Sequence, residues 1–405
     1  MNYFDGKLQR GFLLLLSSRA INQIGEGLLG IFIPIFLYTL FEKNIYLLFF
    51  YYLLGFLLFG FLVAPGARLI NKTGFKNALI TGSISVVLFY VTLVFAEKWN
   101  VWYFIFSSIA TLTLFRILYW VPFHTDFTLF TDHRNRGREV GALTAVLALL
   151  GAFGPVIAGY LIAKTGFTIL FVITIALHFA SVVPLLMLPE TKEQFSWSYR
   201  ETWKHFFSKE KRGALLALGA LGAENSIALI VWPIFIFELL QGNVLEVGLV
   251  STVVVITTIV LQLLVGKYLD ISKLKKDETL RIGSVFYAVG WIGKIFVVTA
   301  FQIFIVGFYH GITKIFTMTP FDTLVYEISA DEGHYIDEFT VLREMALTFG
   351  RVITLAVVAF LLLFVSLEWT FIIAAGASLL LNAICIVRRK ASPFPEMDRG
   401  LSSLR

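Results

Sequence analysis

Charged side chains interrupt the apolar segments of this chain at matching places. In "FRILYWVPFHT", Arg116 lies six residues before a Pro-Phe pair, and in "TKIFTMTPFDT" Lys314 does the same. Glu26 and Glu224 also lie in the middle of apolar segments. A charge at the centre of a membrane helix costs roughly 2.5–3.5 kcal/mol, so it is usually kept where it pairs inside a bundle or borders water. The chemistry open to this set is ion pairing, ion binding and proton transfer.

Long apolar segments position these charges and predict an all-α membrane protein. Hydrophobic residues make up 58% of the 405-residue chain, charged residues only 15%, and the mean hydropathy is +0.82. A helix needs about 20 apolar residues to cross a bilayer, whereas a β-barrel would show alternating polarity, which this sequence lacks. We predict twelve spans, near residues 12–41, 45–65, 78–96, 101–123, 140–163, 167–189, 213–240, 246–266, 282–299, 302–321, 339–366 and 370–387.

The positive charges predict the orientation of these spans. Most of the 33 Lys and Arg residues fall on the side of the N-terminus, whereas Lys43, Lys98 and Lys164 fall on the other side. Cytoplasmic loops carry such an excess, so we expect a multi-pass monomer in the cytoplasmic (inner or plasma) membrane with both termini cytoplasmic. The net charge of +6 reflects this bias, and no nucleic-acid partner is expected.

The chain contains an internal repeat. "IFIPIFLYTL" in the first span resembles "IVWPIFIFEL" in the seventh, and "ARLINKTGFKN" resembles "GKYLDISKLKK", at nearly the spacing of the pair quoted above. Matches in one order indicate that six spans were duplicated in parallel. Phe195, Tyr199, Trp203 and Phe206, between the copies, have helix-like spacing that fits an interfacial helix, or else a solvated linker. We divide the chain into two six-helix bundles (1–189 and 213–390), a cytoplasmic linker (190–212) and a cytoplasmic tail (391–405).

Six plus six parallel spans around a cytoplasmic loop resemble the major facilitator superfamily over essentially the whole chain. The family's signature after the second span resembles G-x-x-x-D-[RK]-x-G-x-[RK]-[RK], and the second copy here keeps Gly266 and Asp270. The first copy has Ala67 and Asn71 at those places and keeps Lys72. The resemblance implies that this segment closes the cytoplasmic gate, with Asn71 able only to hydrogen-bond where the family has a carboxylate.

The fifth span contains "GAFGPVIAGY", which is similar to a glycine-rich motif common among the family's proton-linked exporters. Its glycines permit close helix contact, and Pro155 permits a bend that could serve gating. The motif favours export.

The resemblance also implies that spans 1, 4, 7 and 10 face a central cavity. Glu26, Arg116, Glu224 and Lys314 would then meet along one water-filled path, with one acid and one base from each half. Further binding or coupling residues are predicted around them. Arg19 and Gln23 share a helix face with Glu26, Arg351 lies deep in span 11, and His310 precedes Lys314 by one turn.

The cations outnumber the acids in this set, which favours a substrate that carries negative charge. Arg343 and Glu344 lie near the cytoplasmic end of span 11, and we predict either a gate pair or a structural pair there. Lys294 and His178 fall on spans that the resemblance makes peripheral, so we expect buried pairing or snorkelling there and no role in transport. Alternatively, His310 is a buried core histidine whose hydrogen bonds are satisfied within the bundle.

The resemblance implies a secondary transporter that moves a small organic solute, anionic or amphipathic, by alternating access. Proton-linked export is the first expectation, with Glu26, Glu224 or both carrying protons; a nutrient symporter or facilitative uniporter is the alternative. A membrane-embedded transferase is an alternative of another class and would need acidic or nucleophilic groups clustered in a loop. The acid-rich loop "EISADEGHYIDEF" looks more like a solvated connector. No cofactor is expected, since "GEGLLG" follows no strand and no phosphate-binding loop is present. No metal is expected, because His124, Asp126, Asp132 and His133 match no ligand pattern.

Overall fold

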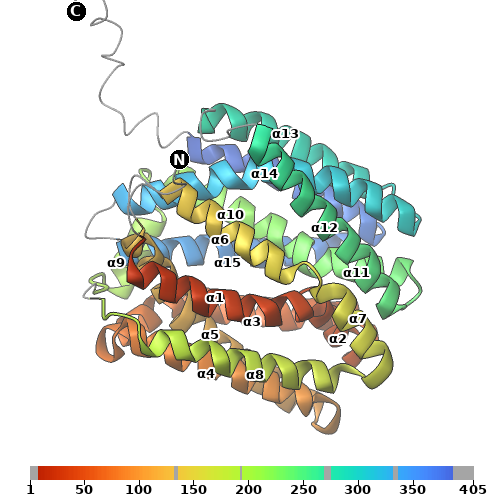
Figure 1. Ribbon diagram of the computed structural model, residues 1–405, viewed down its shortest axis with the longest axis horizontal. Coiled ribbons are helices and arrows are strands. Elements are labelled where there is room, and N and C mark those ends of the chain that lie inside the picture. The colour runs from red at the N-terminus through yellow and green to blue at the C-terminus, as the bar shows by residue number, and fades with distance from the viewer. Residues whose placement is uncertain (1–7, 132–135, 192–193, 269–274, 332–335, 386–405) are drawn as a thin grey trace, which may run out of the picture.

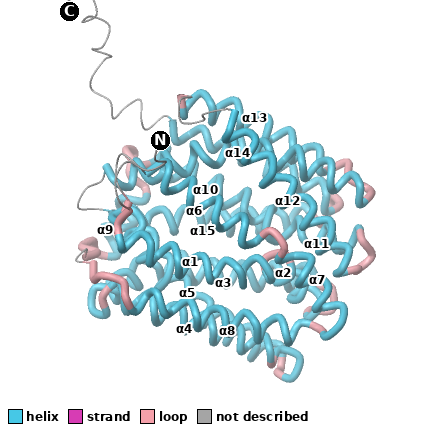
Figure 2. Tube along the Cα trace, viewed as in Figure 1, coloured by secondary structure: helices cyan, strands magenta, loops and turns pink. Residues whose placement is uncertain are grey.

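The computed structural model describes residues 8–131, 136–191, 194–268, 275–331 and 336–385. In these ranges all regular structure is helical (Figure 2). A helix satisfies its backbone groups within one segment, which is what an apolar chain in lipid requires.

The first half of the molecule, here called the N-terminal half, contains α1 (Arg10–Leu29), α2 (Phe32–Leu40), α3 (Ile45–Thr73), α4 (Phe75–Val94), η1 (Ala96–Lys98), α5 (Val101–Phe130), α6 (Arg136–Gly151), α7 (Gly154–Thr165) and α8 (Phe167–Leu186). After the linker helix α9 (Tyr199–Phe206), the C-terminal half contains α10 (Arg212–Ser226), the π-turn η2 (Ile227–Val231), α11 (Trp232–Leu239), α12 (Val244–Tyr268), α13 (Lys276–Lys294), α14 (Ala300–Asp331), α15 (Ile336–Leu361), η5 (Leu367–Thr370), α16 (Phe371–Leu380) and η6 (Leu381–Ala383).

Each of the twelve predicted spans overlaps a helix or a run of adjoining helical pieces within the described ranges. By length and hydropathy alone, eight helices of the described residues could cross a membrane, or nine if α1 and α2, bent by 47°, form one span. The last helical run, Leu367–Ala383, is apolar but shorter. The structure therefore agrees with an all-helical, multi-pass membrane protein.

The same packing pattern occurs in both halves. α4 packs against α5 and α8, and α13 packs against α14 and α16 in the same way. α1 packs against α8 and α6, as α10 packs against α16 and α15. This correspondence is what a parallel six-span repeat predicts. The boundaries at 189 and 213 stay a prediction, and the tail 391–405 lies outside the described residues.

The helices run side by side along the long axis, with α9 at one end and the ends of α2, α7 and α11 at the other (Figure 1). We call these the linker end and the far end. Toward the far end the halves meet through α2 with α11 and α7 with α12, and elsewhere through α3 with α15. Tyr38 packs edge-on against Phe237 (ring centroids 6.5 Å apart), and Lys43 Nζ lies 3.1 Å from Glu238 Oε1.

Close approaches between the halves depend on glycine. A Cβ at Gly159 would strike the backbone of Val244, and one at Gly248 would strike the backbone of Pro155. Within the N-terminal half, a Cβ at Gly154 would meet the backbone of Gly27. The close helix contacts predicted for the glycine-rich fifth span are thus confirmed. Pro155 lies at the start of α7, just after the break between α6 and α7.

The predicted interfacial helix is α9, and its aromatic residues contact both halves. Its N-terminus is held by a capping box between Ser198 and Glu201. The Trp203 ring lies 5.7 Å from Phe61 of α3 and 5.6 Å from Phe349 of α15. The linker therefore packs across the joint between the two halves.

Candidate functional site

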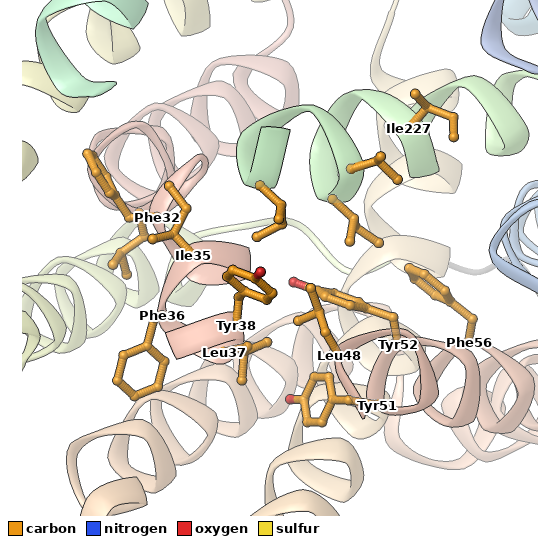
Figure 3. Packing of buried hydrophobic residues seen from close by; sticks show 14 of the residues in the cluster. Phe32, Ile35, Phe36, Leu37, Tyr38, Leu48, Tyr51, Tyr52, Phe56 and Ile227 are labelled. Carbon is orange, nitrogen blue, oxygen red and sulfur yellow. The ribbon is translucent and has the colours of Figure 1, made fainter. Parts of the chain in front are cut away.

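A cavity of about 580 Å³ lies between the two halves. Its walls come from α1, α2, α3, α4, α5 and α8 on one side and from α10, η2 and α15 on the other. The described lining is rich in aromatic rings. Figure 3 shows two of them, Tyr52 and Phe56 of α3, among buried residues of α2 and beside Ile227 of η2. The aromatic lining residues are Tyr52, Phe56, Phe59, Phe89, Tyr90, Phe115 and Trp120.

Arg19 and Glu26 form an ion pair within α1. Both guanidinium nitrogens of Arg19 donate to the two carboxylate oxygens of Glu26 at 2.9 Å. Arg19 is 8% exposed, and its guanidinium lies 5.5 Å from the centre of the Trp120 ring. Gln23 and Glu26 line the cavity, so the predicted polar face of the first span does face it. The charges of Arg19 and Glu26 offset each other.

Arg116 of α5 and Arg351 of α15 approach the same aromatic ring from opposite halves. Their guanidinium carbons lie 4.8 and 5.3 Å from the centre of the Phe56 ring, and both side chains line the cavity. Within the described ranges, no carboxylate oxygen lies within 4.0 Å of either guanidinium group. Among the described residues, neither guanidinium group therefore forms a direct ion pair, and Glu344 interacts with them only at longer range.

A second ion pair lies on α15. Arg343 Nη1 donates to Glu344 Oε1 at 2.7 Å, and His124 Nε2 of α5 lies 3.8 Å from the same oxygen. His124 Nδ1 lies 3.0 Å from the Tyr326 hydroxyl of α14. Arg343 and Glu344 line the cavity and connect α15 to α5 and α14. A gating role for them stays a proposal.

Glu224 and Lys314 do not join this cavity. Glu224 is 1% exposed and accepts a 2.6 Å hydrogen bond from the Tyr287 hydroxyl, inside the C-terminal half. Lys314 is an exposed residue of α14, and neither residue is among those that line the cavity. The expectation of four charges on one path is therefore wrong for these two. Helical spacing shows which residues share a face, but bundle packing decides which face borders the cavity.

His310 and Lys294 lie near Glu224. His310 is buried and its ring lies 4.3 Å from Tyr287 and 4.8 Å from Trp291. Lys294 is buried and does not snorkel, and its Nζ lies over the Trp232 and Trp291 rings.

His178 departs from its predicted peripheral place. It is buried, stacks on Tyr90 with 5.2 Å between ring centres, and lines the cavity. The sequence also did not predict the aromatic walls of the cavity. The chain contains 41 Phe residues, and their spacing does not distinguish those that line the cavity from those that pack between helices.

The gate residue Asn71 contacts the linker. Its amide nitrogen donates to the Phe195 carbonyl at 2.8 Å, and its amide oxygen accepts the Phe195 N–H at 3.0 Å. Next to it, the N–H and hydroxyl of Ser196 donate to Glu338 of α15 at 2.8 and 2.6 Å. We call residues 195–196 the clasp, because they join α3 to α15. Sequence reasoning missed Glu338, which lies in the acidic loop set aside as a connector.

The remaining predictions concern the gate residues Lys72 and Asp270 and the absence of a metal site. Lys72 is exposed in the last turn of α3, and Asp270 lies outside the described residues. Among described residues no group of three or more His, Cys, Asp or Glu side chains could hold a metal. Asp126 instead accepts a 2.6 Å hydrogen bond from Thr191, while Asp132 and His133 lie outside the described residues.

Comparison with known proteins gives the class. The sequence profile of the Major Facilitator Superfamily matches residues 15–223 and, again, 214–400. The chain belongs to this superfamily of membrane transporters. No curated protein sequence matches it.

Solved structures have the same fold at low sequence identity. The E. coli fucose:proton symporter FucP matches with a TM-score of 0.66 and 14% identity, covering 94% of this chain and 98% of FucP. The human organic anion transporter MFSD10 matches with a TM-score of 0.68 and 10% identity, covering 93% and 98%. The peptide transporter POT, in complex with alafosfalin, matches with a TM-score of 0.64 and 12% identity, covering 94% and 95%.

Proposed function

We propose that this protein is a secondary transporter that moves a small organic anion across the cytoplasmic membrane by alternating access. Arg116 and Arg351 carry the proposal, because they present two cations to the cavity with no carboxylate within 4.0 Å among the described residues. Burying a charge without a partner is costly, so a bound anion would stabilise both guanidinium groups.

The rest of the cavity supports a substrate with an apolar body. The third described arginine of the wall, Arg343, pairs with Glu344, and the wall carboxylate of Glu26 pairs with Arg19. Aromatic rings form much of the remaining lining, and the volume of about 580 Å³ falls in the usual range for small-molecule sites. MFSD10, which has the same fold, is described as an organic anion transporter.

Alternating access would open the contacts at each end of the cavity in turn. Tyr38–Phe237 and Lys43–Glu238 join the halves at the far end, and the clasp joins them at the linker end. The cavity lies between these contacts, as rocking of two bundles about a central site requires. We place the linker end and both termini in the cytoplasm, from the distribution of Lys and Arg, and treat the monomer as the working unit.

Proton-linked export is the preferred form of transport, with protons bound at the intramembrane ionisable groups around Glu26, Glu224 or both. The glycine-rich fifth span, which packs closely at the joint between α7 and α12, supports export. Symport is the alternative, and the fold-similar FucP is described as a fucose:proton symporter.

The test measures binding and flux of two probes that differ in charge but little in shape, 2-naphthoate and 2-naphthylmethylammonium. We expect the purified protein to bind the naphthoate at least tenfold more tightly, and proteoliposomes to transport it. Arg116→Gln and Arg351→Gln should each weaken naphthoate binding at least tenfold, while Lys72→Gln, an exposed cation of α3, should not. Preference for the ammonium probe would overturn the anion assignment.

The direction of coupling has its own measurement. Under an imposed inward proton gradient, a proton-linked exporter should release substrate from loaded vesicles. A proton symporter should instead accumulate substrate inside them. Flux indifferent to the gradient would leave facilitated diffusion as the mechanism.

A further inference from the structure

A group of ionisable side chains lies inside the C-terminal half, apart from the cavity. Glu224 of α10 accepts the Tyr287 hydroxyl hydrogen bond at 2.6 Å, and the His310 ring of α14 lies 4.3 Å from the Tyr287 ring. Lys294 completes the group from the last turn of α13. None of the four lines the cavity, and all are buried or nearly so.

Lys294 is enclosed by aromatic rings. It is 4% exposed, and its Nζ lies 3.6 Å from the centre of the Trp291 ring and 4.4 Å from that of Trp232. In the described part of the chain no carboxylate oxygen lies within 4.0 Å of this nitrogen. Aromatic faces stabilise an ammonium, but they offset only part of the cost of burying it. A buried lysine can therefore exist with or without its proton.

The π-turn η2 brings Glu224 and the Trp232 ring, which contacts Lys294, to one side of the seventh span. Glu224 precedes the turn, and Trp232 follows it directly. In a regular α-helix, residues eight apart point about 80° apart, because each residue adds about 100°. The extra residue of a π-turn cancels roughly one such step, so Glu224 and Trp232 can both face α13. Such turns occur often at functional sites.

The same stretch of the seventh span also forms cavity wall. Asn225 and Ser226, the two residues after Glu224, line the cavity, as do Leu229 and Ile230 of η2. A movement of this stretch on substrate binding would therefore shift Glu224 and Trp232 relative to Lys294.

We propose that Glu224, Tyr287, Lys294 and His310 form a proton-binding site of the C-terminal half that is separate from the substrate cavity. This inference rests on the proposed function. One proton from the aqueous phase bonds to the Lys294 amine nitrogen and gives an ammonium, which offsets the charge of the Glu224 carboxylate. The reverse step returns the proton to water. Tyr287 orients Glu224 by donating its hydroxyl hydrogen.

Charged and titratable groups face Lys294 from three helices in the described part of the chain. Glu224 faces it from α10, Tyr287 from α13 itself, and His310 and Lys314 from α14. α11 adds the Trp232 ring, and the Phe371 ring of α16 packs against Trp291 and Trp232. Lys314, which is exposed, supplies a matched control for a lysine on the edge of the group.

Tryptophan fluorescence tests the site without any substrate. Because Lys294 contacts two indole rings, its protonation should produce a step in tryptophan emission as pH is varied. We expect the step in wild type and in Lys314→Met, and we expect its loss in Lys294→Met and in Lys294→Arg, which stays charged at every pH used. A step that persists in Lys294→Arg would overturn the proposal. Tyr287→Phe keeps Lys294 and the aromatic ring but removes the hydrogen bond to Glu224, so it should shift the pH midpoint of the fluorescence step. This second variant tests the site even if the lysine variants misfold.

Flux of 2-naphthoate in proteoliposomes then tests coupling. Lys294→Arg should retain naphthoate exchange between equal internal and external concentrations. Its flux driven by a pH gradient should be at least tenfold lower than that of wild type. Wild-type gradient-driven flux in this variant would contradict a coupling role. If wild type fails to bind naphthoate, the anion cavity is wrong, while the fluorescence step still decides on the proton site.

Discussion

Arg19 and Glu26 lie two turns apart on α1 and are joined by two parallel hydrogen bonds of 2.9 Å. The bidentate geometry fixes the Glu26 side chain, which lines the cavity, against Arg19 and leaves that helix face neutral. The acid of the first span is thus balanced within its own helix, and Arg116 and Arg351 supply the charge that distinguishes the cavity.

The first prediction concerns this pair. Arg19→Met and Glu26→Gln should each lower the free energy of unfolding by about 2 kcal/mol, below the roughly 3–5 kcal/mol of a fully buried pair, because the Glu26 side chain is 33% exposed. The double variant should recover much of the loss, since no charge is then left unpaired. Thermal unfolding in detergent measures both, and additive losses in the double variant would contradict the pairing.

The second prediction is that Arg351 destabilises the empty protein. Two like charges over one ring repel, so Arg351→Met should leave the melting temperature of the ligand-free protein unchanged or higher. The same change should abolish the rise in melting temperature that 2-naphthoate produces. Lys72→Met, which alters an exposed cation, should change neither value. A lower ligand-free melting temperature with an intact naphthoate response would argue against an anion site at this pair.

The third prediction reverses the effect expected from the family signature. Asn71 donates one hydrogen bond to Phe195 and accepts another, whereas an ionised Asp could only accept. Asn71→Asp therefore restores the family's usual residue but should weaken the clasp and open the linker end. Hydrogen exchange at residues 195–197 should become at least tenfold faster. Glu338→Ala, which removes the acceptor for Ser196, should do the same, and unchanged protection in both variants would show that the clasp is dispensable.

The fourth prediction concerns the contact between α10 and α15. A Cβ at Gly222 would strike the Leu347 carbonyl, and one at Gly350 would strike the Gly219 carbonyl. Gly222→Ala and Gly350→Ala should each destabilise the protein by about 1–3 kcal/mol through overpacking. Gly376, in α16, has open space around its Cβ position, so Gly376→Ala should be neutral or stabilising by up to about 1 kcal/mol. Equal effects at all three sites would contradict this geometry.

The fifth prediction concerns pH and the linker helix. The Ser198 N–H and hydroxyl, at the start of α9, hold the pKa of the Glu201 carboxyl below its ordinary value. A carboxyl with a lowered pKa adds stability above its unfolded value of about 4.3 and loses it as pH falls further. α9 should therefore stay docked at neutral pH and loosen below about pH 4.3. Hydrogen exchange across α9 measures this, and Glu201→Gln should remove the pH dependence.

Local chemistry was enough to predict the helical membrane fold. Apolar runs of spanning length allow only one way to satisfy the backbone in lipid, and the repeat around Pro34 and Pro233 reports duplication without reference to contacts. The shared face of Arg19, Gln23 and Glu26 also followed from helical spacing, and the structure places the last two on the cavity wall.

The tertiary structure decided which charges meet. Arg116 and Arg351 are far apart in the sequence and come together only because α3, α5 and α15 pack around Phe56. Glu224 faces Tyr287 inside its own half, and Lys314 stays exposed, although both occupy the positions that repeat symmetry pairs with Glu26 and Arg116. Sequence sets the rotation of residues within one helix. The rotation of each helix against its neighbours depends on side-chain packing, on glycine contacts and on the π-turn η2, which are properties of the assembled bundle.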